Sequence, residues 1–240
     1  MANSYFQFKQ FTIQQNNCAM KVCTDACLFG AWIAEILSQQ NKSPQNILDI
    51  GSGTGLLSLM IAQKSNAAID GVEIDTEAFL QSLENIQQSP FNKRIVITNT
   101  DVLALQFSKK YDWIITNPPF FEQDLKSDNH QKNSAKHDST LTLHQLLQVV
   151  DKTLHQEGYF ALLLPYHRAG FFIEAAKKST LYLTKKVLIK QTPGHDYFRA
   201  MLVFTRQQKM VSIEEISIKN EANNYTEVFT GLLKDYYLFL

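Results

Sequence analysis

The residues best suited to chemistry are Asn117, Pro118, Pro119 and Phe120, which directly follow an apolar run at 111–116. An amine attached to an aromatic ring is a poor nucleophile, because its lone pair is conjugated into the ring. The Asn117 side-chain oxygen and the Pro118 carbonyl can accept its N–H bonds, hold it in line with a methyl donor and stabilise its developing positive charge. The prolines restrict the backbone, and Phe120 can stack on the base. The pattern predicts methyl transfer to a planar, conjugated nitrogen, most favourably adenine N6.

A glycine-rich loop, Asp49-Ile50-Gly51-Ser52-Gly53-Thr54-Gly55, lies between an apolar run at 47–50 and a helical pattern at 54–64. Gly51, Gly53 and Gly55 allow a tight turn and a close approach to a ligand, and the next helix offers free N–H groups. This spacing differs from the GxGxxG of dinucleotide-binding loops. Asp49 would attract the ammonium of a methionine moiety and repel a pyrophosphate. The loop therefore favours S-adenosylmethionine over NAD as the cofactor.

Three further carboxylates follow the next two strands. Glu73 ends the apolar run at 69–73, where it could accept hydrogen bonds from both ribose hydroxyls of the cofactor. Asp75 could share this role or cap the following helix. Asp101 could receive the adenine amino group of the cofactor or simply occupy a turn.

The elements that must position these residues alternate between strand and helix. We expect strands at 47–50, 69–73, 95–98, 111–116, 159–164, 181–189 and 200–205, and helices at 24–38, 54–64, 76–88, 141–155 and 168–179. Alternating βα units form a parallel sheet covered on both faces. The sequence therefore predicts an α/β class I methyltransferase (Rossmann-like) fold: a mostly parallel, seven-stranded sheet with an antiparallel hairpin at its edge.

We expect one methyltransferase domain over residues 1–240. Residues 1–45 form an N-terminal extension that covers the cofactor site, 46–206 the Rossmann-like core and 207–240 a C-terminal tail. Phe6 and Phe8 alternate as on a strand, and Thr24 or Asp25 could cap the helix at 24–38. The aromatic end of the tail, residues 236–240, could pack on the body or on a second subunit.

Composition and residue spacing limit the classes of partner that we expect for this chain. The 240 residues carry 23 basic and 23 acidic side chains, which argues mildly against binding through a broad basic face. The apolar runs are too short to cross a bilayer and residues 1–7 do not resemble a signal peptide, so we expect a cytoplasmic protein without a membrane partner. Cys18, Cys23 and Cys27 are an odd set without a fourth ligand nearby, and the histidines lack ligand spacing. We therefore expect reduced thiols and no metal.

Two basic clusters could contact nucleic acid or form solvated surface. One comprises Lys126, Lys132 and Lys136 with His130 and His137; the other comprises Lys177, Lys178, Lys185, Lys186 and Lys190. Tyr166 and His167, after the strand at 159–164, could line the site or occupy a surface turn.

The motifs together resemble the class I amino-methyltransferases, which use Asn/Asp-Pro-Pro-Phe/Tyr on adenine N6, cytosine N4 or glutamine N5. A narrower resemblance rests on Phe8-Lys9-Gln10-Phe11, the stretch from Cys18 to Trp32, Asn117-Pro118-Pro119-Phe120-Phe121 and the segment from Leu233 to Leu238. In these the chain resembles the bacterial tRNA1(Val) (adenosine-37 N6)-methyltransferase family over its whole length. One departure is Cys23, where the family has a glycine.

The resemblance implies that Lys21, Thr24 and Asp25 lie over the cofactor; without it they would read as a capped helix start. It also implies a tRNA partner whose target base lies in the single-stranded anticodon loop, just 3′ of the anticodon. Loop bases are readily splayed into a protein pocket. We expect the lysine-bearing loop after Phe121 to lie over that base.

The sequence leaves several alternative functions open. The same chemistry could serve glutamine N5 in a protein, adenine in DNA or a small heteroaromatic amine. A glutamine-modifying enzyme usually carries a larger N-terminal helical domain than these 45 residues allow. A nicotinamide oxidoreductase and a non-catalytic RNA-binding protein are further alternatives, and the intact Asn117-Pro118-Pro119 argues against the second.

Overall fold

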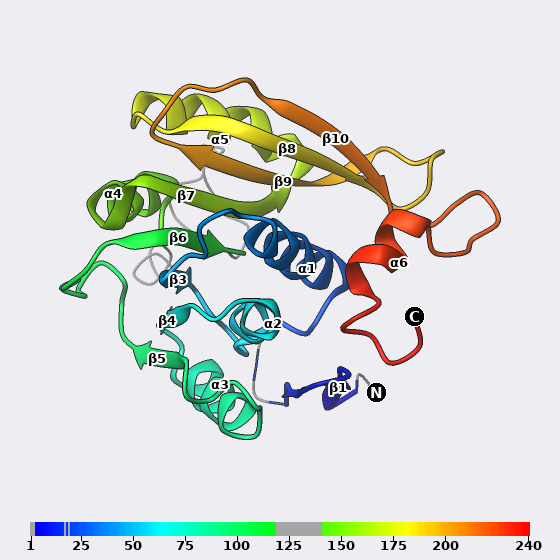
Figure 1. Ribbon diagram of the computed structural model, residues 1–240, viewed down its shortest axis with the longest axis horizontal. Helices are drawn as coiled ribbons and strands as arrows, with labels where there is room; N and C mark the ends of the chain where they lie inside the picture. Colours follow the sequence, from blue (N-terminus) through cyan, green and yellow to red (C-terminus); the bar gives the residue numbers. More distant parts are fainter. Residues whose placement is uncertain (1–2, 17, 19, 119–140) are drawn as a thin grey trace, which may run out of the picture.

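One eight-stranded sheet forms the centre of the computed structural model, which describes residues 3–16, 18, 20–118 and 141–240 (Figure 1). Its strand order is β10-β8-β9-β7-β6-β3-β4-β5. The strands of this sheet are β3 (Asn46–Ile50), β4 (Ala68–Glu73), β5 (Ile95–Asn99), β6 (Tyr111–Thr116), β7 (Leu154–Pro165), β8 (Tyr182–Lys190), β9 (Tyr197–Thr205) and β10 (Ser212–Ser217). A separate antiparallel pair, β1 (Tyr5–Gln7) and β2 (Thr12–Gln14), precedes them.

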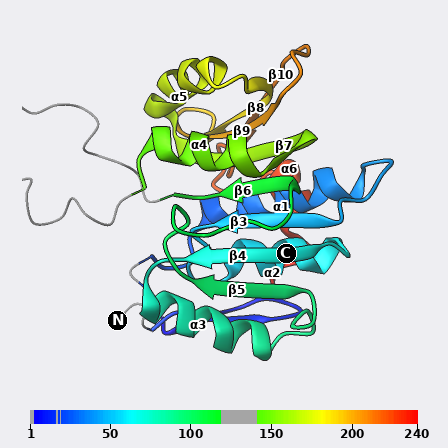
Figure 2. The ribbon, with the colours of Figure 1, turned by 90° about the vertical axis from the view of Figure 1, so that its left-hand side faces the viewer.

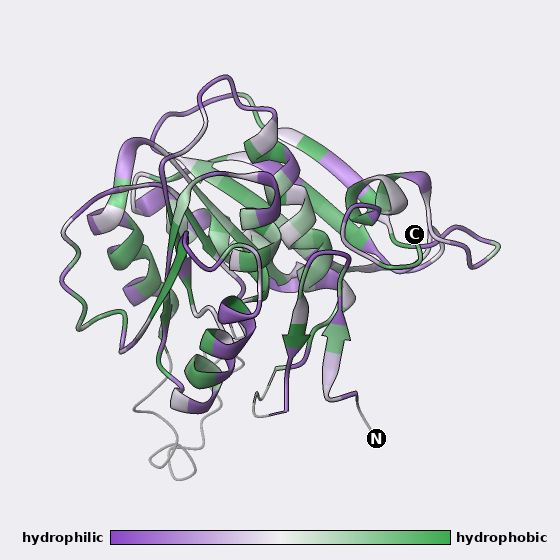
Figure 3. Cartoon of the chain, turned by 60° about the horizontal axis from the view of Figure 1, so that its bottom comes forward, coloured by the Kyte–Doolittle hydropathy of each residue, from purple (hydrophilic) through white to green (hydrophobic). Residues whose placement is uncertain are grey.

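Helices cover both faces of the sheet (Figure 2). They are α1 (Thr24–Ser38), α2 (Leu56–Lys64), α3 (Thr76–Gln87), α4 (Leu143–Thr153), α5 (Tyr166–Lys178) and α6 (Glu227–Leu233). Side chains alternate between the faces of a strand, so Ile47 packs in the core under α1 and α2, whereas Leu48 packs in the core under α4 and α5. Figure 3 shows hydrophobic residues gathered on the strands and on the helix faces turned toward them.

The order in which successive strands are added to the sheet changes side at β3. From β3 it continues to β4 on one side, and it later returns to β6 on the other, with β4, β3 and β6 parallel. The carboxyl ends of these three strands therefore meet at one edge. Such a switch point is where open α/β sheets bind ligands, and it collects the glycine loop, Glu73 and Asn117.

The sequence-based prediction of a mostly parallel α/β sheet with an antiparallel strand pair is confirmed, but the strand count was one too low. β10 pairs in parallel with β8 inside the segment predicted as a tail, so the β8–β9 hairpin is not at the sheet edge. Ile216 is the residue of β10 that enters the core, whereas Ile213 is 66% exposed and Glu214 and Glu215 face solvent. An edge strand with so little buried surface has no clear apolar pattern.

Tyr236 and Tyr237, at the start of the aromatic end of the tail, pack on the body, whereas Phe239 is 95% exposed. Tyr236 is fully buried, and its hydroxyl donates to the Met60 carbonyl of α2 at 2.9 Å. Asp235 forms an ion pair with Lys64, and Tyr237 forms an antiparallel bridge with Phe8. The C-terminal tail thus packs on α2, and the N-terminal segment pairs with the tail.

Replacing Tyr236 by phenylalanine should lower the free energy of unfolding by about 1–2 kcal/mol, because the ring stays packed while the hydrogen bond to Met60 is lost. Tyr236→Ala should cost about 3–5 kcal/mol, since it also opens a cavity. Urea denaturation followed by circular dichroism measures both. Phe239→Ala, at a position 95% exposed in the same tail, is the matched control and should leave the midpoint unchanged. A tail that contributes nothing to stability would give three identical curves.

Candidate active site

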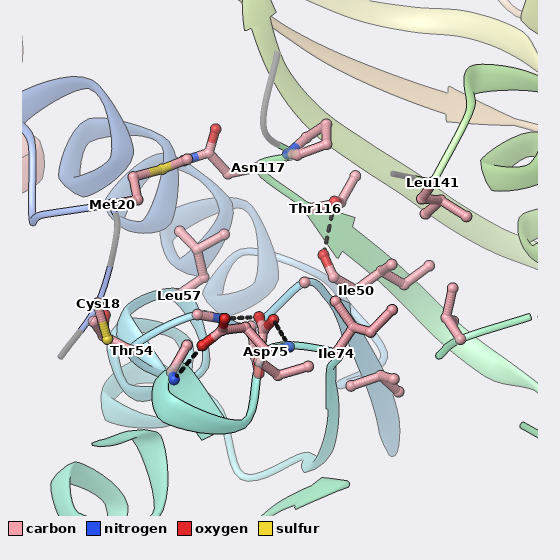
Figure 4. Close-up of a pocket in the computed structure, with 18 of the residues that line it drawn as sticks. Cys18, Met20, Ile50, Thr54, Leu57, Ile74, Asp75, Thr116, Asn117 and Leu141 are labelled. Carbon is pink, nitrogen blue, oxygen red and sulfur yellow. Dashed lines mark hydrogen bonds between the residues drawn. The ribbon is translucent and has the colours of Figure 1, made fainter. Parts of the chain in front are cut away.

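A cavity of about 720 Å³ opens at the carboxyl ends of β3, β4 and β6 (Figure 4). This volume is in the range of small-molecule sites. Asp75 and Asn117 lie well apart across it in the close-up. Of the residues predicted for the site, its walls include Lys21, Gly51, Gly53, Glu73, Asp75, Asp101, Asn117 and Pro118. The cavity therefore unites most of the predicted cofactor and acceptor residues.

The glycine loop has the backbone that its sequence predicts. Gly51, Gly53 and Gly55 have φ values of 71°, 53° and 81°, in the left-handed region that side chains with a Cβ rarely adopt. A Cβ at Gly51 or Gly53 would meet no atom within 4 Å, so the loop leaves open space beside its backbone. Gly55 is buried against α3 and occupies the N-cap position of α2. Two glycines thus face the cavity and the third sets the helix start.

Glu73 anchors the loop from the end of β4. Its Oε2 accepts from the Gly53 N–H at 2.8 Å, and its Oε1 accepts from the Asp75 N–H at 2.9 Å. The side chain is 8% exposed and lines the cavity. Each carboxylate oxygen has two lone pairs, so both keep capacity for a ligand hydroxyl.

Asp75 and Asp101 have structural partners besides their place on the cavity wall. Asp75 caps α3 by accepting from the Ala78 N–H at 2.8 Å, which is the capping role that the sequence left open. Asp101 is exposed and accepts from the Leu103 N–H at 2.8 Å, as expected of a turn aspartate. Both can still reach a ligand in the cavity, and their predicted contacts stay predictions.

Asp49 lies behind the cavity wall. The residue is fully buried, and its Oδ2 accepts from the Ser58 hydroxyl at 2.7 Å. Within the described part of the chain, its Oδ1 has no hydrogen-bond partner. Burial, with a smaller contribution from the Glu73 charge, raises the pKa of Asp49 to about 7, although the Ser58 hydrogen bond opposes the shift. Direct contact of Asp49 with the cofactor ammonium stays a prediction.

The raised pKa of Asp49 predicts a pH-dependent stability. The unfolded carboxyl titrates near 3.8 and the folded one near 7, so between these values the folded state binds the extra proton. Folding is therefore favoured at low pH, and this contribution is lost as pH rises through 7. Asp49→Asn should gain stability relative to the parent by on the order of 1 kcal/mol per pH unit between pH 5 and 7.

Urea denaturation of both proteins at pH 5, 6, 7 and 8 measures this difference. Asp112→Asn is the matched control, because Asp112 is a half-buried carboxylate at the start of β6, whereas the cavity lies at the end of that strand. Its stability curve should stay parallel to that of the parent. Parallel stability curves for Asp49→Asn and its parent would contradict the raised pKa of Asp49.

Asn117 closes the acceptor end of the cavity. The preceding residue, Thr116, donates its hydroxyl to the Ile50 carbonyl at 2.8 Å, which fixes the end of β6 against β3. The Asn117 Oδ1 is fully covered and has no hydrogen-bond partner among the described residues. A covered, unpaired amide oxygen is costly unless a ligand donates to it. Pro119 and Phe120, the other predicted acceptor residues, lie outside the described residues, as does the predicted cluster of Lys126, Lys132 and Lys136.

The N-terminal segment contributes one of its three predicted residues to the cavity wall. Lys21 lines the cavity and donates from Nζ to the Gln15 carbonyl at 2.8 Å. Thr24 is exposed and Asp25 pairs with Arg199, with 2.6 Å between Oδ2 and Nε; neither lines the cavity. Capping of α1 by Thr24 or Asp25 was wrong, because Cys23 occupies the N-cap position without a side-chain cap bond.

Several residues of the site were missed by the sequence analysis. Arg199 holds Asp25 across 174 residues of sequence. Asn85 is buried in α3 and donates to the carbonyls of Thr54 and Gln14 at 2.9 and 3.0 Å, which ties the glycine loop to β2. Other unanticipated wall residues are Cys18, Met20, Ile74, Val102, Leu103, Leu141, Thr142 and Gln145. No local sequence signal marks such contacts, because each depends on the folded arrangement.

The described residues include neither a cluster suited to a metal ion nor a helix suited to a membrane. Outside residues 1–2, 17, 19 and 119–140, no group of three or more His, Cys, Asp or Glu side chains could hold a metal ion. Over the same residues, no helix has the length and apolar character needed to cross a membrane.

Known proteins resemble this chain in sequence and fold. A family model described as the methyltransferase small domain matches residues 31–164. A tRNA1(Val) (adenine(37)-N6)-methyltransferase of Dyadobacter fermentans is 42% identical over 241 residues, which cover 98% of each protein. Another, of Parabacteroides distasonis, is 39% identical over 242 residues, or 99% of each. A predicted O-methyltransferase from Agrobacterium tumefaciens superimposes with a TM-score of 0.66 at 15% identity, covering 88% of this chain and 96% of that one. The structural likeness confirms the predicted methyltransferase fold.

Proposed function

We infer the function from the family: the chain belongs to the methyltransferase small domain family and, within it, to the tRNA1(Val) (adenine(37)-N6)-methyltransferases. It is an S-adenosylmethionine-dependent enzyme that methylates the N6 amino group of adenosine 37 in a tRNA. The resemblance noted in the sequence is thereby confirmed. The observation in this chain that carries the reaction is the covered, unpaired Oδ1 of Asn117 at the wall of the cavity.

The cavity suits the cofactor in its size and in the residues that line it. S-adenosylmethionine supplies an electrophilic methyl group on a sulfonium. We propose that Gly51 and Gly53 leave room for it along the loop and that Glu73 accepts from its ribose hydroxyls. Asp101, with Val102 and Leu103 beside it, would receive the adenine end. Asp49, which lies behind the cavity wall, would favour the ammonium in its ionised form.

The acceptor side rests on Asn117 and Pro118. The Asn117 side-chain oxygen and the Pro118 carbonyl would accept the two N–H bonds of the adenine amine, which orients the nitrogen lone pair toward the methyl group. As the nitrogen becomes cationic, both oxygens stabilise its charge, so no strong general base is needed. The proton leaves once the nitrogen is charged. Pro119 and Phe120 complete this motif in the sequence, with Phe120 as the proposed stacking residue.

Around this centre the remaining assignments are proposals. Lys21 lines the cavity and would contact the cofactor, whereas Thr24 and Asp25 would act through the placement of α1, with Arg199 as the partner of Asp25. Residues 1–45 would cover the cofactor and 46–206 would form the catalytic core. The tRNA would bind through its anticodon loop, in the cytoplasm.

Incubating the protein with radiolabelled S-adenosylmethionine and a tRNA1(Val) transcript, followed by digestion to nucleosides, tests the function. We expect label in N6-methyladenosine. A transcript with guanosine at position 37 is the matched substrate control and should take up no label. Label in both transcripts would displace the target to another adenosine, and label only in added DNA or protein would remove the tRNA assignment.

A further inference from the structure

Beside the cavity, the same edge of the sheet carries a pair of tyrosines that the reaction does not use. Tyr166 begins α5 directly after β7, and Tyr197 begins β9. Their ring centroids are 5.1 Å apart with an angle of 50° between the planes. Tyr166 is 39% exposed, whereas Tyr197 is half-buried against the core under α4 and α5. The pair therefore presents one ring outward and supports it with a second.

The supporting ring is fixed on two sides. The Lys190 ammonium lies over the Tyr197 ring at 4.4 Å from its centroid, and the Tyr197 hydroxyl donates to Glu215. Lys190 also pairs with Glu215 at 3.5 Å. Because the cation is balanced by a carboxylate, this site adds little net positive charge. A rigid aromatic surface without excess charge suits stacking on a planar group better than it suits contact with phosphates.

The position of the pair connects it to the acceptor motif. β7 is the neighbour of β6 on the side away from β3, and β9 is the next strand beyond it (Figure 1). Thr116 pairs with Leu162, so β7 extends three residues past that level to Pro165, which pairs with Arg199 of β9. From strand spacing and rise, Tyr166 lies on the order of 10 Å from Asn117. A nucleotide next to the methylated base can span that separation.

Resting on the proposed function, we propose that Tyr166 and Tyr197 form a stacking platform for an unpaired base adjacent to the target adenosine. Extruding an adenine from a loop breaks its stacking with both neighbours. An aromatic ring at this edge replaces one of those contacts, and such stacking tolerates any base. Tyr166 makes the contact and Tyr197 positions it. The platform would help to hold the loop open while Asn117 engages the extruded base.

Fluorescence anisotropy with a labelled tRNA1(Val) transcript, in the presence of S-adenosylhomocysteine, tests the platform. Tyr166→Ala should weaken tRNA binding about 10-fold, whereas Tyr166→Phe, which keeps the ring, should bind like the parent. The slope of log Kd against log salt should stay unchanged, because no phosphate contact is lost. Phe239→Ala, which removes an aromatic ring that is 95% exposed in the C-terminal tail, is the control and should have no effect.

A second arm identifies the stacked nucleotide. Transcripts with an abasic residue at position 36 or 38 should each be compared with the parent transcript for both proteins. With the stacking neighbour removed, the parent enzyme should lose the same affinity and Tyr166→Ala should lose nothing more. Equal binding of Tyr166→Ala and parent, or a loss that phenylalanine does not rescue, would overturn the platform. Failure of the proposed function would show differently, as absence of N6-methyladenosine from tRNA treated with the parent enzyme.

Discussion

Asn117→Ala should lower kcat for tRNA methylation about 100- to 1,000-fold, the scale on which removal of one preorganised polar group acts on a charged transition state. The variant should fold normally. The Oδ1 of Asn117 has no hydrogen-bond partner among the described residues, so its removal breaks no hydrogen bond within that part of the protein. Single-turnover rates with saturating tRNA and cofactor isolate the chemical step.

Two comparisons make this result specific to the acceptor contact. Asn117→Asp keeps an oxygen acceptor at nearly the same place and should retain more activity than the alanine variant. The Kd of the alanine variant for S-adenosylhomocysteine, measured by calorimetry, should stay within about threefold of the parent, because uniform binding is not what the substitution removes. An unchanged single-turnover rate would remove Asn117 from the chemistry.

The centre of the sheet could be predicted because β3 and β6 are buried on both faces. Residues 47–50 and 111–116 are short apolar runs bounded by polar turns, and both became strands of the central sheet. Apolar runs of this length, bounded by turn residues, are shorter than a typical helix and are typical of a buried strand. β10 escaped because Ile216 is its buried apolar side chain and Glu214 and Glu215 are solvent-exposed. Its place is fixed by pairing with β8, which a local pattern does not reveal.

The site could be predicted where function depends on contiguous residues. Gly51, Gly53 and Glu73 are marked by their types and by their positions at strand ends, and all three line the cavity. Asp49 shows the limit of such reasoning. Its type predicts a contact with the ammonium, which stays a prediction, but the sequence did not reveal that the carboxylate is fully buried and accepts from Ser58. Position at a strand end fixes the neighbourhood of a residue and leaves open which of two faces its side chain enters.

Contacts between residues far apart in the sequence could not be predicted from local sequence patterns. The expected place of Asp25 over the cofactor stays a prediction, and its ion pair with Arg199 on β9, a strand far along the chain, was not foreseen. Arg199 faces Pro165 of β7, so the ion pair ties the start of α1 to the edge that carries Tyr166 and Tyr197. The N-terminal segment, which brings Lys21 to the cavity, is thereby attached to the strands beside the acceptor motif. The Asp25–Arg199 ion pair therefore links the segment that lines the proposed cofactor site to the strands of the proposed RNA-binding edge.

Glu73→Ala should weaken S-adenosylhomocysteine binding about 100-fold, the loss expected when hydrogen bonds to a charged acceptor disappear together. Two contributions add. The ribose hydroxyls lose their proposed acceptor, and the Gly53 N–H, which donates to Oε2 at 2.8 Å, loses the anchor that shapes the loop. Glu73→Gln keeps one oxygen and should lose about 10-fold, because its NH₂ group cannot accept.

Calorimetric titration with S-adenosylhomocysteine measures each Kd without requiring turnover. Glu77→Ala is the matched control, since Glu77 is an exposed carboxylate in the first turn of α3 and lies outside the cavity wall. If Glu73 acts mainly through the loop, Glu73→Gln should lose as much affinity for S-adenosylhomocysteine as Glu73→Ala, and both variants should lose thermal stability. If it acts mainly through the ribose, Glu73→Ala should bind the 2′-deoxy and ribose forms of the ligand equally, while the parent prefers ribose. Binding of Glu73→Ala equal to that of Glu77→Ala would exclude both roles.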